Sequence, residues 1–366
     1  MKLLQHDNIG SHYRSAIYRL MDREFGCDFC FGDGWDDIKK MDYSTLHGKV
    51  IEVRNVRKPH IYFQKGLMKM LRADYDTYII CAETRNMSAW FFLLVRKMFY
   101  PKKRVFAWIH GMLGKEGAAK RLMYRFQQWL MTGSFIYNER SVKIMIEHGV
   151  PANKLHTIYN SLDYDAQLEI RKTLSASSIY HEHFGNGNRN IVFIGRLTKV
   201  KRFDLLLDAV AILKQRGVMV NVTFIGDGVE RQGMELRTTE LGIRDQVWFY
   251  GACYDESKNA EMIYNADLCV SPGNIGLTSM HALMFGCPAI TNDDFDHQMP
   301  EFEAIKKGIS GAFFKSDDSE SLADTISDWF SAHGNDREEV RKACFEEIDT
   351  KWNPYNQLRI LKEVLL

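Results

Sequence analysis

Residues 267–292, DLCVSPGNIGLTSMHALMFGCPAITN, constrain the fold of this chain more than any other stretch. The apolar run 268–270 predicts a buried strand that ends at Ser-Pro-Gly-Asn. A short helix is expected from Leu277, with Gly286 at its end and a second strand beyond. Because Gly276 opens this helix directly after a buried strand, backbone N–H groups at the helix start are available to an anion. The stretch therefore predicts an anion-binding loop between a strand and a helix.

Strands and helices alternate along most of the chain. Apolar runs predict strands at 2–5, 29–31, 50–53, 77–81, 105–109, 191–194 and 222–225, and helical patterns lie between several of them, one at 61–71. This alternation is typical of parallel sheets. The length of 366 residues allows two domains with separate cores, and the content of 45% hydrophobic and 26% charged residues is that of an ordinary globular protein.

The number and positions of the cysteines and the hydropathy of the sequence exclude several classes of protein. Seven scattered cysteines form no disulfide framework, and the pair Cys27 and Cys30 lies among phenylalanines in an expected core strand rather than in a zinc site. No apolar run is long enough to span a bilayer, and the amino terminus lacks the apolar stretch of a signal peptide. We therefore expect a cytoplasmic protein without a metal site.

Charge is divided unevenly between the two halves. Residues 1–165 carry 26 Lys and Arg against 17 Asp and Glu, whereas the remainder carries 22 against 30. A basic half can bind anionic lipid, nucleic acid or a phosphorylated acceptor.

Residues 88–104 combine aromatic residues with five basic ones, which suits docking on an anionic bilayer, and the alternative is a core helix with a basic end. The helix expected at 118–131, with Trp129 on it, adds weight to the first interpretation.

Residues 273–290, GNIGLTSMHALMFGCPAI, resemble the motif E-G-F-G-L-x-x-x-E-A-x-x-x-G-x-P-V-I of the retaining glycosyltransferases of family 4, within the glycosyl transferases group 1. The glycines and the proline of this segment match those of the family motif, and so does the spacing between them. Gly273 and His281 stand where the family has glutamates that contact the donor sugar and the ribose. A neutral His281 can still exchange a hydrogen bond with a ribose hydroxyl.

A second segment, Gly195-Arg196-Leu197-Thr198-Lys199-Val200-Lys201, resembles the G-R-L-x-x-x-K of the same family. The resemblance implies that Arg196 and Lys201 hold the donor diphosphate. Two fixed cations near the leaving group stabilise the negative charge that grows on it, so neither a metal nor another cofactor is expected.

The resemblance assigns further residues. His110 follows the strand 105–109, at a sheet edge where ligands of open α/β folds bind, and it is expected beside the donor sugar as a catalytic residue with Arg196 and Lys201. The expected donor-binding residues are Gly195, Gly226, Asp227, Gly228, Gly273, Asn274, Gly276, Leu277, Thr278 and His281. The expected acceptor-side residues are Gly10, His12 and Arg14, for which a solvated loop is the alternative. Glu301 and Glu303 are expected at the surface.

The family implies an α/β protein with the GT-B fold, in which two Rossmann-like domains with parallel sheets face each other across a cleft. We expect an acceptor-side domain at 1–165 with a terminal helix at 352–366 packed back on it, a polar linker at 166–189 and a nucleotide-sugar domain at 190–351. The implied function is that of a retaining hexosyltransferase acting in surface polysaccharide biosynthesis. It would move a sugar from a nucleotide diphosphate sugar to a glycan or lipid-linked glycan, at the inner face of the cell membrane and without a nucleic-acid partner. The alternatives are a non-catalytic scaffold that binds nucleotide sugars and a sugar-nucleotide epimerase.

Overall fold

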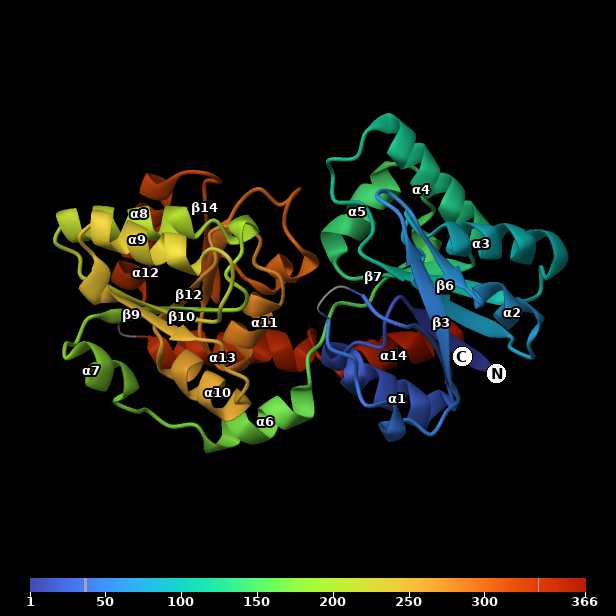
Figure 1. Ribbon diagram of the computed structural model, residues 1–366, viewed down its shortest axis with the longest axis horizontal. Coiled ribbons are helices and arrows are strands. Elements are labelled where there is room, and N and C mark those ends of the chain that lie inside the picture. Colours follow the sequence, from blue (N-terminus) through green and yellow to red (C-terminus); the bar gives the residue numbers. More distant parts are fainter. Residues whose placement is uncertain (36–37, 335) are drawn as a thin grey trace. The chain divides into compact units, whose positions relative to one another are not determined.

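The computed structural model describes residues 1–35, 38–334 and 336–366. The chain forms two compact units: unit 1 comprises Met1–Tyr164 and Asn353–Leu366, and unit 2 comprises Asp165–Trp352. In each unit, helices pack around a sheet (Figure 1).

Unit 1 is built on an eight-stranded sheet with the order β4-β3-β2-β1-β5-β6-β7-β8, in which only the β3–β4 pair is antiparallel. The strands are β1 (Leu3–Asp7), β2 (Asp28–Gly32), β3 (Val50–Arg57), β4 (Tyr62–Lys65), β5 (Thr77–Ile80), β6 (Arg104–Ile109), β7 (Gly133–Ile136) and β8 (Leu155–Thr157). The helices are α1 (Ser15–Phe25), α2 (Leu67–Arg72), α3 (Met87–Phe99), α4 (Ala118–Leu130), α5 (Glu139–Glu147) and α14 (Pro354–Leu365), with short 3-10 helices at His12–Arg14, Tyr43–Thr45 and Ala152–Lys154.

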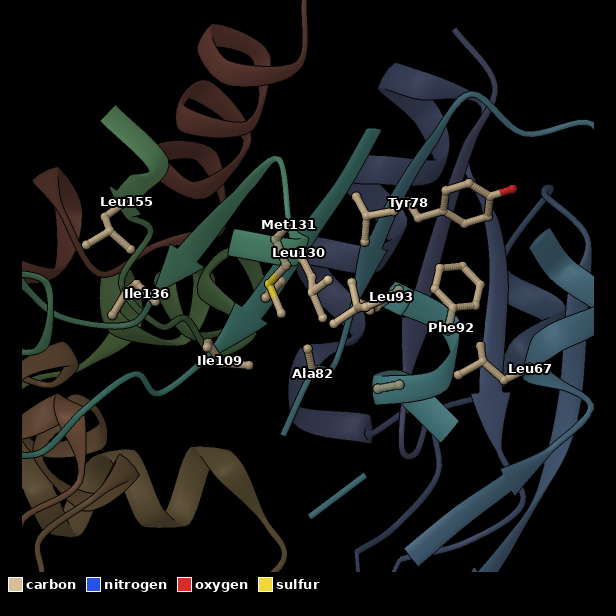
Figure 2. Close-up of a cluster of buried hydrophobic side chains, with 14 of the residues drawn as sticks. Leu67, Tyr78, Ala82, Phe92, Leu93, Ile109, Leu130, Met131, Ile136 and Leu155 are labelled. Carbon is tan, nitrogen blue, oxygen red and sulfur yellow. The ribbon is translucent and has the colours of Figure 1, made fainter. Parts of the chain in front are cut away.

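Alternate residues of the central strands face two separate cores, because side chains of a strand point to opposite faces of the sheet. Tyr78 and Ile80 of β5 belong to a cluster with side chains of α2, α3, α4 and α5, and Figure 2 shows Phe92 and Leu93 of α3 in this cluster. Ile79 belongs to the other cluster, which contains residues of α1 and α14. The last helix of the chain thus completes the core of unit 1.

Several helices begin where the sequence provides a capping side chain. An aspartate or asparagine oxygen accepts a backbone N–H of the first turn, which satisfies a donor that has no acceptor within the helix. The residues that do so are Asn86, Asn138, Asp255, Asp318 and Asn353, at the starts of α3, α5, α10, α12 and α14.

The helix expected at 61–71 is shorter, and a strand precedes it. Residues Tyr62–Lys65 form β4, antiparallel to β3, and only Leu67–Arg72 are helical. Gly66, with φ of 112°, separates the two elements in a conformation that favours glycine. The buried Gln64 side chain accepts a hydrogen bond of 2.6 Å from Nδ2 of Asn86, which holds β4 in place.

Unit 2 is built on a six-stranded parallel sheet with the order β11-β10-β9-β12-β13-β14. The strands are β9 (Arg189–Ile194), β10 (Val220–Ile225), β11 (Val247–Gly251), β12 (Leu268–Val270), β13 (Ala289–Asn292) and β14 (Gly311–Phe314). The helices are α6 (Tyr164–Thr173), α7 (Ile179–Phe184), α8 (Phe203–Gln215), α9 (Arg231–Glu240), α10 (Glu256–Asn265), α11 (Leu277–Met284), α12 (Ser319–Ala332) and α13 (Arg337–Thr350), with 3-10 helices at Lys199–Lys201, Arg244–Gln246 and Pro300–Ala304.

The segment 166–189, expected to be a linker, instead belongs to unit 2 and contains most of α6 and all of α7. Side-chain contacts with residues distant in sequence attach it there. Gln167 donates a hydrogen bond of 2.7 Å to Glu256, Arg171 pairs with Asp349 at 2.8 Å, and the buried Tyr180 donates its hydroxyl to the carbonyl of Met262. The polar composition of the segment reflects these contacts and not a free chain.

Candidate functional site

Two loops of unit 2 follow neighbouring strands at the point where the strand order reverses. β9 is the first strand of the unit and lies between β10 and β12. The loop after β9 contains Gly195 to Lys201, and the loop after β12 contains Ser271 to Gly276. In open α/β sheets, ligands bind at the carboxyl ends of the strands at such a switch point. The two segments with the strongest sequence motifs thus come together where a ligand is expected.

Backbone hydrogen bonds join the two loops. The N–H of Gly273 donates to the carbonyl oxygen of Lys201 at 2.8 Å, and the N–H of Asn274 donates to that of Val200 at 3.2 Å. A Cβ atom on Gly273 would lie 2.0 Å from the carbonyl oxygen of Val200, which no side chain can do without moving backbone. Gly273 therefore holds the loops together, and the glutamate of the resembled motif does not fit here.

Lys201 reaches from the first loop to the end of the second. Its Nζ donates hydrogen bonds to the carbonyl oxygens of Asn274 and, at 3.3 Å, Ile275. Burial lowers the pKa of Lys201 to about 8, and the nearby Glu301 partly opposes this change. A bound anion would favour the charged form of the ammonium group. Lys201 is thus placed to interact with an anion at the start of α11.

The start of α11 is held firmly against the sheet. Gly276 precedes the helix with φ of 53°, and the Thr278 hydroxyl donates to the carbonyl oxygen of Ile194, at the end of β9, at 2.8 Å. Ser279 donates its hydroxyl to the carbonyl oxygens of Gly276 and Glu301, each at 2.9 Å. Since the first N–H groups of a helix have no acceptors within it, those of Leu277 and Thr278 are positioned to bind an anion.

Several residues that sequence reasoning missed support this loop. Gln298 is buried; its Oε1 accepts the N–H of Ile275 at 2.9 Å and its Nε2 donates to the carbonyl of Gly273 at 3.0 Å. Asn292 donates to the carbonyl of Pro272 at 2.7 Å. Glu301 was expected at the surface, and this was wrong: it is 2% exposed and near Lys201. Nothing in the sequence around the end of β13 marks these amide and carboxyl side chains as partners of the loop before α11.

The loops after β9 and β10 approach too closely for side chains at two glycines. A Cβ atom on Gly226 would lie 1.8 Å from the carbonyl oxygen of Gly195, and one on Gly228 would lie 2.2 Å from that of Leu197. Asp227, between them, accepts the N–H of Gly228 at 2.7 Å and pairs with Arg231 at 3.3 Å. These predicted donor-binding residues therefore also shape the loop in which the exposed Arg196 stands.

His281 of α11 lies beside a carboxylate supplied by another helix. Its Nδ1 is 3.5 Å from Oε1 of Glu256, the first residue of α10. Burial lowers the pKa of His281, and the charge of Glu256 partly opposes this. The position thus combines a neutral imidazole with a carboxylate that comes from outside the motif.

In unit 1, the expected catalytic His110 and the expected acceptor-side Arg14 line one cavity of about 200 Å³. Desolvation by the surrounding protein, and then the charge of Arg14, lower the pKa of His110 to about 4. The solvated-loop alternative is wrong for Arg14, which is 6% exposed and paired with Asp7. His12 is exposed and is not among the residues that line the cavity, and Gly10 packs against Tyr43 and Phe31.

The predicted site residues thus form two sets, one in each unit. In unit 2, Gly195, Lys201 and the segment 273–278 meet at the switch point, whereas Arg14 and His110 meet in unit 1. Within residues 1–35, 38–334 and 336–366, no group of three or more His, Cys, Asp or Glu side chains could hold a metal ion. The same part of the chain contains only free cysteines.

Comparison with known proteins agrees with this geometry. Residues 180–346 match the model of the family described as glycosyl transferases group 1. An uncharacterised 41.2 kDa protein in the cps region of Klebsiella pneumoniae is 24% identical over 257 residues, 69% of this chain and 62% of that protein. A GDP-mannose-dependent alpha-(1-6)-phosphatidylinositol dimannoside mannosyltransferase of Mycobacterium tuberculosis is 31% identical over 105 residues, 28% of this chain and 26% of that enzyme. The matched parts span less than two thirds of each relative.

Solved structures are similar over nearly the whole chain. The Anabaena protein Alr3699/HepE in complex with UDP superposes with a TM-score of 0.73, at 16% identity, over 100% of this chain and 99% of that one. The lipopolysaccharide outer core galactosyltransferase WaaB superposes with a TM-score of 0.71, at 16% identity, over 99% of each chain. Residues 180–346 are thus similar to the group 1 glycosyl transferases, and the chain has the GT-B fold.

Proposed function

We propose that this protein is a retaining glycosyltransferase that moves a sugar from a nucleotide diphosphate sugar to a glycan or lipid-linked glycan acceptor in surface polysaccharide biosynthesis. The similarity to structures determined with UDP and with UDP-glucose supports a nucleotide-sugar donor. The relative in a cps region supports the polysaccharide context. Membership of family 4 within this group is part of the same proposal.

One observation carries the proposal more than any other: Lys201 bonds to the carbonyls that directly precede the start of α11, at the switch point of unit 2. The half-buried ammonium group of Lys201, whose pKa is lowered, gains stability when an anion binds next to it. The helix N–H groups of Leu277 and Thr278 offer the same anion further donors. A diphosphate is an anionic group that can bind to the ammonium group and to these N–H groups at the same time.

The proposed reaction needs stabilisation of a leaving diphosphate. Lys201, Arg196 and the first turn of α11 would hold this group and oppose the charge that grows on it as the glycosidic bond breaks. We propose that the leaving phosphate oxygen accepts the proton of the attacking hydroxyl on the same face of the sugar, so that configuration is retained. In this mechanism no metal ion is required, and EDTA should leave turnover unchanged.

We also propose that unit 1 contacts an anionic membrane surface. No helix in the described part of the chain has the length and apolar character needed to span a bilayer. Exposed apolar residues nevertheless gather on α3 and α4, and they are Met87, Phe91, Leu94, Met98, Phe99, Leu122, Phe126 and Trp129. Exposed basic residues accompany them at Lys69, Arg72, Lys97, Lys102, Lys120 and Arg125. Apolar side chains bordered by cations are complementary to an anionic bilayer.

A 710 Å³ groove between α2 and α3 belongs to this surface. Phe91, Val95 and Phe99 line it from α3, and Lys69 and Arg72 line it from α2. Three of the five basic residues in segment 88–104 have contacts within unit 1. Arg96 is buried, and Lys103 and Arg104 donate hydrogen bonds to backbone carbonyl oxygens of unit 1. Segment 88–104 therefore contributes both to the core and to this exposed surface.

Thermal unfolding of the full chain with UDP, GDP, ADP and CDP tests the donor site. A nucleotide that binds only the folded protein stabilises it by about 2.7 kcal/mol at a hundredfold excess over its Kd. We expect one nucleotide to raise Tm selectively, and Arg196→Ala to remove most of this rise. Lys199→Ala, which removes an exposed cation from the same loop, is the matched control and should keep it.

Turnover separates the enzyme from the two alternatives. A selective rise in Tm without release of nucleotide from any sugar donor, in the presence of a glycan acceptor mixture, would favour the non-catalytic scaffold. Conversion of the donor sugar without an acceptor and without nucleotide release would favour the epimerase. No rise with any nucleotide would contradict the donor site itself.

A further inference from the structure

Helix α3 is apolar on two sides, and only one of them faces the core of unit 1. Phe92 and Leu93 are fully buried in that core, as Figure 2 shows. Phe91, Val95 and Phe99 recur four residues apart, so they form a second stripe along the helix, and all three line the groove between α2 and α3. Phe91 and Phe99 remain more than half exposed. The second stripe therefore forms one wall of an open groove.

The rest of the groove is also largely apolar. Met68 and Leu71 of α2 line it together with Tyr100, which directly follows α3. Leu71 is 1% exposed, whereas Met68 and Tyr100 are half-buried. The volume of about 710 Å³ lies within the range of roughly 300–1,000 Å³ that is typical of ligand pockets. Because large exposed apolar surfaces usually mark sites of interaction, the groove is a candidate site for an apolar ligand.

The charged residues that line the groove are both cations. Lys69 and Arg72 lie in the last turn of α2 and are exposed. Within residues 1–35, 38–334 and 336–366, neither side chain forms an ion pair with a carboxylate, and no Asp or Glu lines the groove. An anionic group beside Lys69 and Arg72 would therefore gain their attraction without displacing an existing partner.

An anionic lipid has the chemistry of both parts of the groove. Its acyl chain is slender enough to lie along an apolar stripe, and its phosphate carries the charge that the two cations lack. A free phosphate would leave the apolar lining in water, and an uncharged hydrocarbon would leave the cations without a partner. A second copy of this chain is disfavoured, because a symmetric pair brings the same patch against itself and these cations would face each other.

We propose that the groove binds one acyl chain of an anionic phospholipid, with the lipid phosphate beside Lys69 and Arg72. The inference rests on the proposed contact between unit 1 and an anionic membrane. It adds a discrete site for a single lipid to a surface that otherwise needs only positive charge and apolar area. The groove contains none of the residues assigned to the donor site or to the cavity beside His110, so the lipid and the nucleotide bind independently.

Short-chain lipids, used below the concentrations at which they form micelles, test the proposal without a bilayer. Calorimetric titration of the full chain compares dihexanoyl and dioctanoyl phosphatidylglycerol, the matching phosphatidylcholines, and glycerol 1-phosphate, which has no chain. We expect affinity for phosphatidylglycerol to rise roughly fourfold for each further methylene group that the groove buries. Dioctanoyl phosphatidylglycerol should bind severalfold more tightly than the phosphatidylcholine. Glycerol 1-phosphate should show no measurable binding.

A variant that fills the groove tests where the chain lies. Val95→Phe places a ring in the open space and should weaken dioctanoyl phosphatidylglycerol at least roughly tenfold, the effect of displacing about two methylene groups. The matched control is Leu94→Phe, which enlarges the neighbouring side chain of α3. Leu94 is exposed and does not line the groove, so this affinity should stay unchanged. Tm of both variants should stay close to that of the parent protein.

A second variant tests the role of the cations. Lys69→Gln combined with Arg72→Gln should remove the preference for phosphatidylglycerol over phosphatidylcholine and keep the dependence on chain length. Lys120→Gln is the matched control, because Lys120 is an exposed lysine of α4 that does not line the groove. All these variants should keep the nucleotide-induced rise in Tm, which depends on unit 2.

Equal affinity for the two chain lengths, or equal effects of Val95→Phe and Leu94→Phe, would overturn the proposal. So would a dimer in sedimentation velocity that Val95→Phe dissociates, because a second copy would then occupy the groove. Flotation with anionic vesicles in the absence of short-chain lipid binding would contradict the groove site and leave the proposed membrane contact intact. Binding of short-chain lipid without flotation would support the groove site and contradict only the membrane contact.

Discussion

Gly273 and Val200 approach so closely that a Cβ atom on the glycine would lie 2.0 Å from the carbonyl oxygen of Val200. The contact joins the loop after β12 to the loop after β9, beside Lys201. The family motif has a glutamate at this position. The presence of glycine at position 273, where the motif has glutamate, is therefore linked to the packing of these two loops. It involves more than the loss of one acidic group.

Gly273→Ala should destabilise unit 2 and weaken nucleotide binding, because the new methyl group displaces backbone that holds Lys201. We expect a loss of about 1–3 kcal/mol, the usual cost of overpacking. Urea unfolding monitored by circular dichroism measures it. Gly187→Ala, at an exposed glycine with no atom near the added Cβ, is the matched control and should change stability by less than about 0.5 kcal/mol. Equal stability of the two variants would contradict the packing argument.

Nucleotide affinity should fall as pH rises through about 8. Burial lowers the pKa of Lys201 to about 8 in the free protein, and a bound diphosphate favours the protonated form and raises this pKa. Binding at pH 8.5 therefore takes up a proton, whereas at pH 6.5 Lys201 is already charged. Calorimetric titrations in two buffers with different ionisation enthalpies measure this uptake. Lys201→Arg should abolish it because guanidinium stays charged, while the control Lys199→Arg should keep it.

The same lowered pKa affects stability without ligand. The unfolded chain binds a proton at this lysine up to about pH 10.5, whereas the folded chain releases it near pH 8. Between these values the unfolded state binds more protons, so the contribution of Lys201 to stability rises with pH. Below pH 8, Lys201→Met should therefore cost less stability than it does at pH 10, as unfolding in urea at the two pH values would show.

His281→Glu, which restores the second glutamate of the motif, should destabilise the protein at pH 8. The new carboxylate would lie beside Glu256, whose Oε1 is 3.5 Å from Nδ1 of His281. Two carboxylates this close repel each other, and we expect a cost of roughly 1–3 kcal/mol. The cost should shrink at pH 5, where the pair can share a proton.

A double-mutant cycle isolates this interaction. Adding Glu256→Gln to His281→Glu should recover most of the lost stability, whereas Glu256→Gln alone should have a small effect. His281→Gln is the neutral control for the loss of the imidazole. If the double variant is no more stable than His281→Glu, the repulsion from Glu256 is not the cause.

Several strands of the sheets could be predicted from the sequence because they are buried on both faces and appear as continuous apolar runs, as at Leu268–Val270 and at residues 191–193. The positions of Lys201 and Gly276 followed from motif spacing, which local backbone geometry fixes. β4 was missed because Tyr62–Lys65 has apolar residues at a spacing that also suits a helix, and only its pairing with β3 decides between them.

The side chains missed at the site depend on contacts between distant segments. Gln298 supports the loop before α11 because the chain returns there after β13, and Glu301 approaches Lys201 by the same route. The burial of Arg14 depends on its ion pair with Asp7 and on the Trp108 ring 4.3 Å away. Such contacts cannot be inferred from the composition or from the spacing of residues. The sequence alone therefore predicts that polar residues in loops are exposed to solvent.

Unit 1 should bind vesicles of phosphatidylcholine with phosphatidylglycerol at low salt, and should bind pure phosphatidylcholine weakly. Phe91 and Phe99 on α3 are 58% and 68% exposed, and exposed lysines lie near them along the chain at Lys97 and Lys102. Attraction between these cations and the lipid headgroups is screened by salt, whereas burial of the rings is not. Flotation at two salt concentrations therefore separates the two contributions.

The double variant Phe91→Ser, Phe99→Ser should reduce binding to the anionic vesicles by at least about tenfold, since each ring contributes apolar area on insertion. Leu236→Ser is the control, because Leu236 is an exposed apolar residue on α9 of unit 2. Both variants change exposed side chains, so Tm should stay close to that of the parent protein. Binding that depends on salt but is insensitive to the double variant would assign the interaction to the lysines alone. Absence of binding at low salt would contradict the membrane surface altogether.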